Sequence, residues 1–483
     1  MIIISAILFF CLNAAVKSDT VNVSVDFNKE TGTLLRPELY NNNSLLRTPS
    51  DAIVEKYTRE IGIAEMMRCW VTIDDYWNPE TNEYNFNFPC GWDLNKWDRF
   101  YNYMDRFSRT SNEILFNVRG LHKEVAEGKI SMQKWREACK AGIKHYKQLY
   151  PRIKYIEALN EYELKTFGAL TNEQYYQFYK EFYKIVNEVN NELRPVTPLL
   201  IGGPCITNGS LINGLKKDNM RYFLKAYAND KDPDKRLDFI SYHEYRSAHD
   251  PSLIAQHEGL IHSWCKEFGL SENIPVFLNE MGDNSAERFN NTPIQNNQLL
   301  QAALMASYFY YLKDLRYTKG FHWVIQHKNQ DRKNQIYDNL RWSPYGMSLK
   351  MQSRMAPVEV EVDYPGPSAG KGVYCIASKG ENKYTVMVWN YQWEHGKDSS
   401  TVNLDFRGIP EMKGSRNYIL KEYLLDLTHN NIHTAYPLLS DTHHAAEQLR
   451  ESKVEEISNN NKISCTVRLA PNAMCLIEIT QEK

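Results

Sequence analysis

An alternation of short apolar runs with helix-length amphipathic stretches constrains the fold of this chain more than any other feature of its sequence. It repeats from about residue 32 to residue 355, and this order of elements is typical of a parallel sheet covered by helices. Eight apolar runs fall in that span: 33–35, 64–71, 114–118, 155–159, 199–201, 239–242, 276–278 and 321–325. Eight units over roughly 320 residues favour a closed (β/α)8 barrel over an open sheet.

Helix boundaries can also be placed from the sequence. Ser131 precedes one helical stretch, and Thr171 with Gln174 three residues later predicts a capping box at the start of another. A later helix carries an apolar stripe suited to packing on a sheet, formed by residues at every fourth position: Leu300, Leu304, Tyr308 and Leu312.

The hydrophobic period changes near residue 356, where apolar residues begin to alternate in twos. The segment 358–362 is the first of seven short predicted strands in the remaining residues, a series that indicates a β-sandwich. We therefore expect an α/β chain with a (β/α)8 TIM barrel at residues 17–355 and an appended C-terminal β-sandwich at 356–483. Residues 20–27 also alternate and offer a further strand that crosses over to that sandwich before the barrel begins.

The chain begins with an apolar segment that has the character of a secretory signal. Its first sixteen residues contain no Asp, Glu, Lys or Arg and end close to the small residues Ala14 and Ala15, which predicts a signal peptide at residues 1–16 and a secreted or periplasmic protein. No later stretch approaches the 18 or so consecutive apolar residues of a membrane helix. We therefore expect no membrane span.

Charge and cysteine content exclude other classes of protein. Lys and Arg number 57 against 59 Asp and Glu, a net charge of −2, so there is no global basic field for nucleic acid. The cysteines are scattered without a C-x-x-C pair, which argues against a zinc framework and against a disulfide-dependent scaffold. At most, Cys465 and Cys475 are placed to pair across a hairpin.

Two glutamates follow apolar runs at corresponding places in the repeat. The fourth run ends in Asn160-Glu161 and the seventh in Asn279-Glu280. The working residues of a (β/α)8 enzyme lie at the carboxyl ends of its strands, and a carboxylate there costs desolvation free energy unless it faces a polar cavity. Strands four and seven lie on roughly opposite sides of an eight-stranded ring, so we expect the two carboxylates to face each other across the barrel mouth.

Facing carboxyl groups with room for a sugar between them are what glycoside hydrolysis requires. One donates a proton to the departing oxygen, while the other, ionised, attacks or guides attack at the anomeric carbon. Each glutamate alone could instead cap a helix, but the occurrence of the same dipeptide twice favours the catalytic interpretation. Two carboxylates suffice for this chemistry, so we expect no cofactor and no metal site.

The sequence resembles the clan A glycoside hydrolases, which carry Asn-Glu after strand four and a second Glu after strand seven. Within the clan it is most similar to glycoside hydrolase family 39, the family of β-xylosidases and α-L-iduronidases. Residues 238–245 resemble that family's sixth strand, and residues 67–75 resemble its second. The resemblance implies that Glu161 is the general acid/base and Glu280 the nucleophile of a retaining double displacement, with Asn160 on the sugar 2-hydroxyl.

Five further residues are candidates for contact with the sugar. The resemblance places His243 and Tyr245 near the nucleophile, and Trp323 after strand eight is expected as a stacking floor. Trp70 stands where family 39 has a sugar-binding histidine, and Arg119 replaces an apolar wall. The alternatives are that His243 is a hydrogen-bonded core histidine, Tyr245 a rim tyrosine, Trp323 part of the barrel packing and Arg119 a solvated rim charge.

We therefore expect a retaining glycosidase that hydrolyses O-glycosyl bonds of polysaccharide-derived substrates, with exo-action on β-xylosides or L-arabinosides favoured. The alternative is a non-catalytic carbohydrate-binding protein on the same barrel. A carbohydrate is the only partner implied, and the sequence does not define an oligomeric state. The separation of the two carboxyl groups distinguishes the mechanisms, being about 5–5.5 Å for retention and about 6.5–9.5 Å for inversion.

Overall fold

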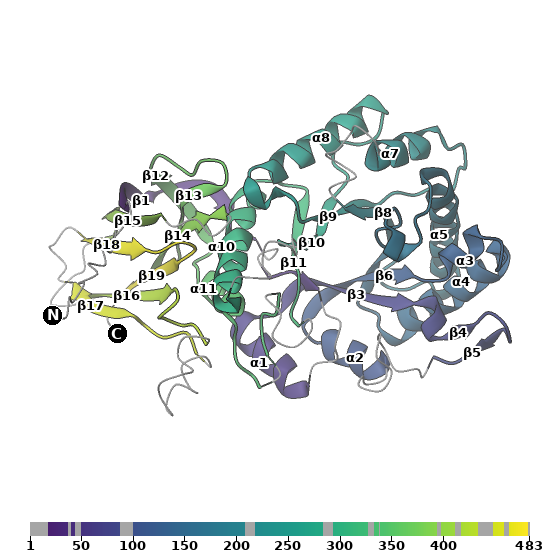
Figure 1. Ribbon diagram of the computed structural model, residues 1–483, viewed down its shortest axis with the longest axis horizontal. Coiled ribbons are helices and arrows are strands. Elements are labelled where there is room, and N and C mark those ends of the chain that lie inside the picture. Colours follow the sequence, from purple (N-terminus) through teal and green to yellow (C-terminus); the bar gives the residue numbers. More distant parts are fainter. Residues whose placement is uncertain are drawn as a thin grey trace, which may run out of the picture.

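The computed structural model shows a barrel and a β-sheet unit side by side, with helix α10 (Ile294–Leu312) between them (Figure 1). The structure describes residues 18–36, 40–43, 50–86, 100–207, 218–283, 293–326, 333–337, 339–393, 398–410, 417–432, 448–457 and 463–481. The predicted signal peptide lies outside these residues. Within them, no helix is long and apolar enough to cross a membrane.

Eight parallel strands close into the barrel in the order β10-β11-β2-β3-β6-β7-β8-β9. Their bounds are β2 (Asn42–Asn43), β3 (Ala64–Thr72), β6 (Ser111–Arg119), β7 (Ile153–Ala158), β8 (Leu200–Thr207), β9 (Phe239–Glu244), β10 (Val276–Met281) and β11 (Thr318–His322). The predicted fold class, a (β/α)8 barrel with a C-terminal β-sandwich, is confirmed.

The helices of the described residues surround the barrel and carry the predicted caps. They are α1 (Asp51–Ile61), α2 (Phe100–Phe107), α3 (His122–Ala126), α4 (Met132–Leu149), α5 (Asn172–Leu193), α7 (Asn219–Asn229), α8 (Leu253–Glu267), α10 and α11 (Pro344–Ser353). The Ser131 hydroxyl accepts the Lys134 N–H at 3.3 Å and caps α4. The capping box of Thr171 and Gln174 at the start of α5 is confirmed.

The predicted first barrel strand at residues 33–35 is wrong. Residues 33 and 34 end β1 (Ser18–Leu34), which belongs to the other sheet, and the first barrel strand is β2. Both residues of β2 are fully buried asparagines. The Asn43 side chain donates to the carbonyl oxygens of Asn279 at 2.8 Å and His322 at 3.1 Å. A strand of two polar residues has no apolar period, so hydrophobic patterning could not find it.

The second unit is a nine-stranded sheet in the order β17-β16-β19-β14-β13-β12-β1-β15-β18. Its C-terminal strands are β12 (Val358–Asp363), β13 (Lys371–Lys379), β14 (Lys383–Gln392), β15 (Ser399–Arg407), β16 (Tyr418–Leu425), β17 (Lys453–Ile457), β18 (Ile463–Leu469) and β19 (Met474–Gln481). The N-terminal strand β1 pairs antiparallel with β12 and parallel with β15.

The sheet folds over a shared apolar core, which gives the unit its sandwich character. Val25 of β1, Val388 of β14 and Ile477 of β19 are buried in one hydrophobic cluster. Cys465 and Cys475 are also buried there as free thiols, so the disulfide that their positions allowed is not formed.

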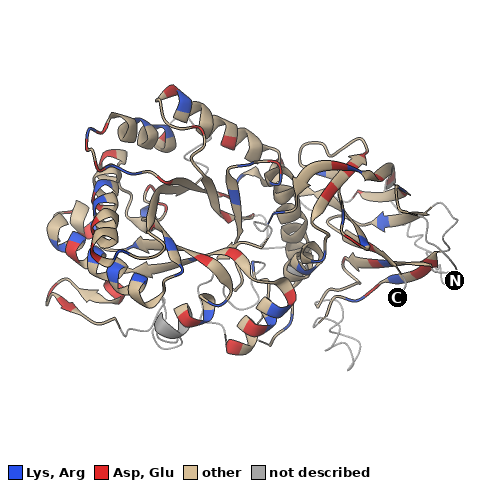
Figure 2. Ribbon diagram, turned by 180° about the vertical axis from the view of Figure 1, so that it is seen from behind, with Lys and Arg blue, Asp and Glu red and all other residues tan. Residues whose placement is uncertain are grey.

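Charges of both signs are interspersed along the outer helices (Figure 2). Helices α4 and α5 show the pattern at atomic scale, where Arg136 Nε lies 2.8 Å from Glu181 Oε2 and Lys140 Nζ lies 2.8 Å from Glu188 Oε2. The positive charges of α4 are thus paired with carboxylates of α5. The surface formed by these two helices therefore has no excess of positive charge of the kind that attracts nucleic acid.

Candidate active site

The carboxyl ends of the barrel strands bring the two predicted carboxylates together. Glu161 follows β7, and Glu280 lies near the end of β10. One ligand atom from each of Glu161, Glu280 and His243 of β9 lies within 4.8 Å of the others. The side chains of the two glutamates are only 13% and 10% exposed. Both carboxyl groups are therefore largely shielded from solvent at the carboxyl end of the barrel.

Both oxygens of Glu280 have a hydrogen-bond donor. Arg68 Nη1 donates to Oε1 at 2.7 Å, and the Tyr245 hydroxyl donates to Oε2 at 2.6 Å. Burial raises the pKa of this carboxyl, but His243 and Arg68 lower it more, so that the net pKa lies below its ordinary value. Burial and the neighbouring Glu280 raise the pKa of Tyr245 well above its usual value. Glu280 is therefore an ionised carboxylate held by two fixed donors.

Arg68 is the central cation of the site and is itself held in place. Its Nε donates to Glu157 Oε2 at 2.8 Å, and its Nη2 donates to Asn160 Oδ1 at 2.8 Å. Glu157, fully buried in β7, also accepts from the side-chain amides of Asn117 and Asn279. A guanidinium fixed on several sides loses little conformational freedom when it binds a further carboxylate. Arg68 therefore presents a preorganised donor to Glu280.

Glu161 is positioned by the backbone turn after β7 and by His243. Leu159 and Glu161 have φ angles of 61° and 41°, values that residues other than glycine rarely adopt. The Glu161 N–H donates to the carbonyl oxygen of Cys205 at 2.8 Å. His243 Nδ1 lies 2.8 Å from Glu161 Oε1. Glu161 is thus held at its backbone by Cys205 and at its carboxyl group by His243.

His243 connects the two glutamates. Its Nδ1 is also 3.5 Å from Glu280 Oε2, and its Nε2 is 3.3 Å from Cys205 Sγ. Burial alone lowers the pKa of His243, but Glu280, Cys205 and Glu161 together raise it well above its usual value. The imidazole therefore carries a proton on Nδ1 that it can donate toward the carboxylate pair.

The remaining predicted residues form an aromatic and cationic wall beside the pair. The rings of Trp70 and Trp323 are stacked with centres 5.9 Å apart. The Arg119 guanidinium lies 5.3 Å from the ring centre of Trp70 and 5.6 Å from that of Phe167. Arg119 is only 8% exposed, so it is not a solvated rim charge. All eight predicted site residues lie at this end of the barrel.

Three residues for which no role was predicted belong to the same network: Arg68, Glu157 and Cys205. Glu157 lies inside an apolar run, and Cys205 lies in β8 with its thiol against His243 and Arg68. The usable signal was the charge of Glu157 between the apolar residues Ile156 and Ala158, because a buried charge needs a partner of opposite charge. Arg68, equally isolated in β3, is that partner.

Glu161, His243 and Glu280 are also the one group in the described part of the chain with spacing suited to a metal ion. Both Glu280 oxygens already accept hydrogen bonds from Arg68 and Tyr245. A cation bound here would compete with these donors and would lie beside the guanidinium charge. The donor set therefore fits a carboxylate pair better than a metal centre.

The solved structures that share this fold include glycoside hydrolases. A monomeric β-xylosidase from Caulobacter crescentus CB15 matches with a TM-score of 0.70 at 12% identity, over 95% of this chain and 99% of that chain. The bacterial orthologue of human α-L-iduronidase matches with a TM-score of 0.68 at 11% identity, over 96% and 84% of the two chains. A GH39 enzyme from Xanthomonas axonopodis pv. citri gives a TM-score of 0.64 at 11% identity, over 96% and 98%.

These matches confirm the predicted resemblance to clan A and family 39 at the level of the fold. No family model matches the sequence, and no curated protein matches it.

Proposed function

We propose that this protein is a retaining glycoside hydrolase in which Glu280 is the nucleophile and Glu161 the general acid/base. The observation that carries the proposal is that one carboxylate oxygen of the partly buried Glu161 lies within 4.8 Å of an oxygen of the buried Glu280. Retaining pairs are separated by about 5–5.5 Å, whereas inverting pairs at about 6.5–9.5 Å leave room for a water molecule. The short separation supports direct attack by Glu280 on the anomeric carbon.

In the first step Glu280 forms a bond to the anomeric carbon while Glu161 gives its proton to the departing glycosidic oxygen. Arg68 and Tyr245 hold the two oxygens of the nucleophile in place before attack, and His243 orients Glu161. The product of this step is a glycosyl ester of Glu280 and a free alcohol.

In the second step a water molecule replaces the Glu280 carboxylate on the anomeric carbon. Once Glu280 is esterified, Glu161, which has given its proton to the departing alcohol, is the free carboxylate of the pair. Glu161 can then take a proton from the water, which attacks the anomeric carbon and releases Glu280. Two displacements restore the original anomeric configuration.

The substrate that we propose is a β-xyloside or an L-arabinoside at the end of a polysaccharide-derived chain, with exo-action. The β-xylosidase among the structurally similar proteins supports this choice. Trp323, which is partly exposed and stacks on the buried Trp70, offers an aromatic face at the same end of the barrel, which suits a sugar ring. The apolar segment at residues 1–16 supports export of the protein to the compartment where such polymers lie.

The test is a screen of the protein without residues 1–16 against aryl xylosides, arabinosides, uronides and galactosides. Glu280→Ala should abolish hydrolysis, and Glu161→Ala should spare mainly substrates whose leaving group departs without a proton. Glu163→Gln is the matched control, since Glu163 is buried two residues beyond Glu161 but hydrogen-bonds to Thr207. NMR of the first-formed sugar should show the retained anomer.

Three results would contradict the proposal. Full activity in Glu280→Ala would show that the nucleophile is another residue, and an inverted product would exclude double displacement. Binding of sugars without hydrolysis of any of them would instead favour a carbohydrate-binding protein.

A further inference from the structure

Cys205 lies at an irregularity in strand β8, where β8 holds one residue more than its neighbour β9. The register between the two strands shifts between Pro204 and Ile206, which leaves Cys205 as the extra residue. Its φ is 56°, a value that residues other than glycine rarely adopt. An extra residue of this kind bends a strand and redirects a side chain, often beside an active site. The fully buried Cys205 side chain accordingly lies among the charged groups of the candidate site.

Two different atoms of Cys205 hold the two members of the Glu161–His243 pair. Its carbonyl oxygen accepts the Glu161 N–H at 2.8 Å, and its Sγ lies 3.3 Å from His243 Nε2. The other imidazole nitrogen, Nδ1, lies 2.8 Å from Glu161 Oε1. The three residues therefore form a closed ring of contacts, in which the thiol holds the imidazole on the side away from Glu161.

The hydrogen of the Cys205 thiol has an acceptor other than His243. Burial and the nearby Glu157 raise the pKa of Cys205, so the sulfur keeps its proton. The S–H donates to Asn160 Oδ1 at 3.5 Å, and the sulfur accepts from Arg68 Nη2 at 3.3 Å. A thiol carries one hydrogen, so a thiol that donates to Asn160 can only accept from His243. The Nε2 atom must then carry a proton.

A proton on each imidazole nitrogen also balances the charges of this cluster. Three carboxyl groups and two guanidinium groups surround His243 and the Cys205 thiol, together with one phenol. They belong to five barrel strands and the turns that follow them: Arg68 (β3), Arg119 (β6), Glu157 (β7), Glu161 (after β7), Tyr245 (after β9) and Glu280 (β10). Charges in a protein interior need partners of opposite sign, and an imidazolium brings the positive groups to three against three carboxylates.

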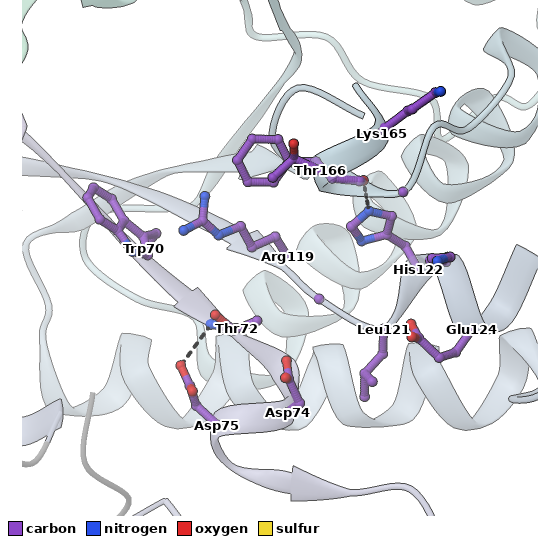
Figure 3. A pocket seen from close by; sticks show the side chains of 14 residues that line it. Trp70, Thr72, Asp74, Asp75, Arg119, Leu121, His122, Glu124, Lys165 and Thr166 are labelled. Carbon is purple, nitrogen blue, oxygen red and sulfur yellow. Dashed lines mark hydrogen bonds between the residues drawn. The ribbon is translucent and has the colours of Figure 1, made fainter. Parts of the chain in front are cut away.

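The imidazole and the thiol are both closed off from solvent. A cavity of about 390 Å³ lies over the loops after β3, β6 and β7, and its lining includes Trp70 and Arg119 but neither His243 nor Cys205 (Figure 3). Arg119 extends toward Trp70 there, with its guanidinium 5.3 Å from the ring centre. His243 and Cys205 are fully buried. Removal of the thiol would therefore leave the Nε2 proton as a buried donor without its acceptor, which costs desolvation free energy.

We propose that Cys205 is a positioning residue, whose sulfur accepts the Nε2 proton of His243 and thereby keeps the Nδ1 proton directed at Glu161. The inference rests on the proposed function for the role of Glu161 as general acid/base, and it extends that function to the source of the proton. His243 Nδ1 passes its proton to Glu161, which gives it to the departing oxygen and leaves a neutral imidazole with Nε2–H on the sulfur. In the second step the proton that Glu161 takes from water returns to Nδ1, which restores the imidazolium.

The first test observes the ring nitrogens and needs neither a Cys205 variant nor turnover. In protein made with ¹⁵N-labelled histidine, the two nitrogen resonances of His243 are identified by their absence in His243→Gln. Both nitrogens should carry protons at neutral pH. An Nε2 atom without a proton at that pH would overturn the inference, whether or not the variants below fold.

The second test removes the sulfur. In Cys205→Ala the affinity of the His243 ring for its proton should fall about tenfold, because Nε2–H loses its acceptor. Cys205→Ser keeps an acceptor and should restore most of that affinity. Cys139→Ala is the matched control, since Cys139 is equally buried but lies on α4, and it should leave the titration unchanged.

Three results of this titration contradict the inference. They are an unchanged titration in Cys205→Ala, no recovery in Cys205→Ser, and an equal shift in Cys139→Ala.

Kinetics tests the delivery of the proton to Glu161. In Cys205→Ala, kcat/KM should fall about tenfold for glycosides whose leaving group needs a proton and stay within about twofold for aryl glycosides of acidic phenols. Equal losses on both kinds of substrate would indicate a merely structural role and overturn the inference. Failure of the proposed function gives a different result: the protein hydrolyses no glycoside, yet the His243 titration still responds to Cys205→Ala and not to Cys139→Ala.

Discussion

At the scale of single residues, the site depends on one buried guanidinium. Arg68 is 1% exposed and contacts Glu280, Glu157 and Asn160. The planar fork of arginine reaches several acceptors at fixed angles, whereas a lysine ammonium is a compact point charge. The position of Glu280 is therefore tied to the shape of the Arg68 side chain as well as to its charge.

Arg68→Lys should lower kcat/KM about 10²-fold on whichever aryl glycoside the protein hydrolyses, in the range seen when one preorganised donor is lost. Lysine keeps the buried positive charge, so the fold should persist. Steady-state kinetics with a thermal melt of the same sample separates loss of activity from loss of structure. Unchanged kinetics in a folded variant would show that charge alone holds Glu280.

The depressed pKa of Glu280 predicts an acid-sensitive contribution to stability. Glu280 binds its proton more weakly in the folded chain than its ordinary pKa of 4.5 implies, so it stabilises the fold above that pH and loses this contribution as the pH falls through its folded pKa. His243, with a raised pKa, acts in the opposite sense: its contribution is complete below its unfolded pKa and is lost only as the pH rises through its folded pKa.

Urea denaturation from about pH 6 to about pH 3 measures this contribution. The free energy of unfolding should fall less over that interval in Glu280→Gln than in the unchanged protein, because glutamine has no proton to bind. Parallel pH profiles for the two proteins would rule out Glu280 as a source of the acid sensitivity.

Both glutamates of the site could be predicted from sequence because each stands one residue beyond an apolar run, where a buried charge costs desolvation free energy. The pairing of Arg68 with Glu157 and Glu280 could not, since these residues lie on β3, β7 and β10, and only closure of the ring brings them together. The side-chain partner of a buried charge is a property of the fold and not of the local sequence.

At the scale of elements, the spacing of apolar residues predicted the strands and helices that bury one apolar face. It did not predict elements that lack such a face. It missed β2, which is two buried asparagines, and β17, whose residues are mostly exposed at one edge of the sheet. It also predicted one stripe on α10, whereas that helix packs on the barrel and also on the sandwich, where Trp389 Nε1 donates to Ser307 Oγ at 2.9 Å.

Helix α4 gives a test of an element that the sequence predicted well. Ser131→Ala removes the acceptor of the Lys134 N–H and should lower the free energy of unfolding by about 1 kcal/mol. Ser131→Asp keeps an acceptor at the same position and should restore most of the loss. Urea titration of the three proteins checks this, and equal midpoints for all three would mean that the cap contributes nothing.

At the scale of the whole molecule, the barrel and the sandwich share a buried boundary. Leu304 and Tyr308 of α10 are fully buried, and Trp389 of β14 packs in the same hydrophobic cluster as the barrel core. Arg354 at the end of α11 donates to Glu478 Oε1 of β19 at 3.0 Å. The sandwich therefore covers apolar surface that the barrel would otherwise expose.

A chain that ends at residue 355 should accordingly be insoluble or lack a cooperative melt, because one side of α10 would face water. The full chain should show a single calorimetric transition. A soluble shortened chain with a sharp melt and an intact near-ultraviolet spectrum would contradict this and would show that the barrel is self-sufficient.

The parallel pairing of β1 with β15 joins Ser18 to Ser399 and continues to Asp26 and Arg407, so the barrel is an insertion within the sandwich. During synthesis, β1 emerges first and its partner strand only after the whole barrel. Until then β1 has unpaired edges of the kind that recruit other chains, and contacts so distant in sequence form slowly. The delay between synthesis of β1 and synthesis of β15 is therefore the interval in which the first strand can pair with a neighbouring chain instead of its own.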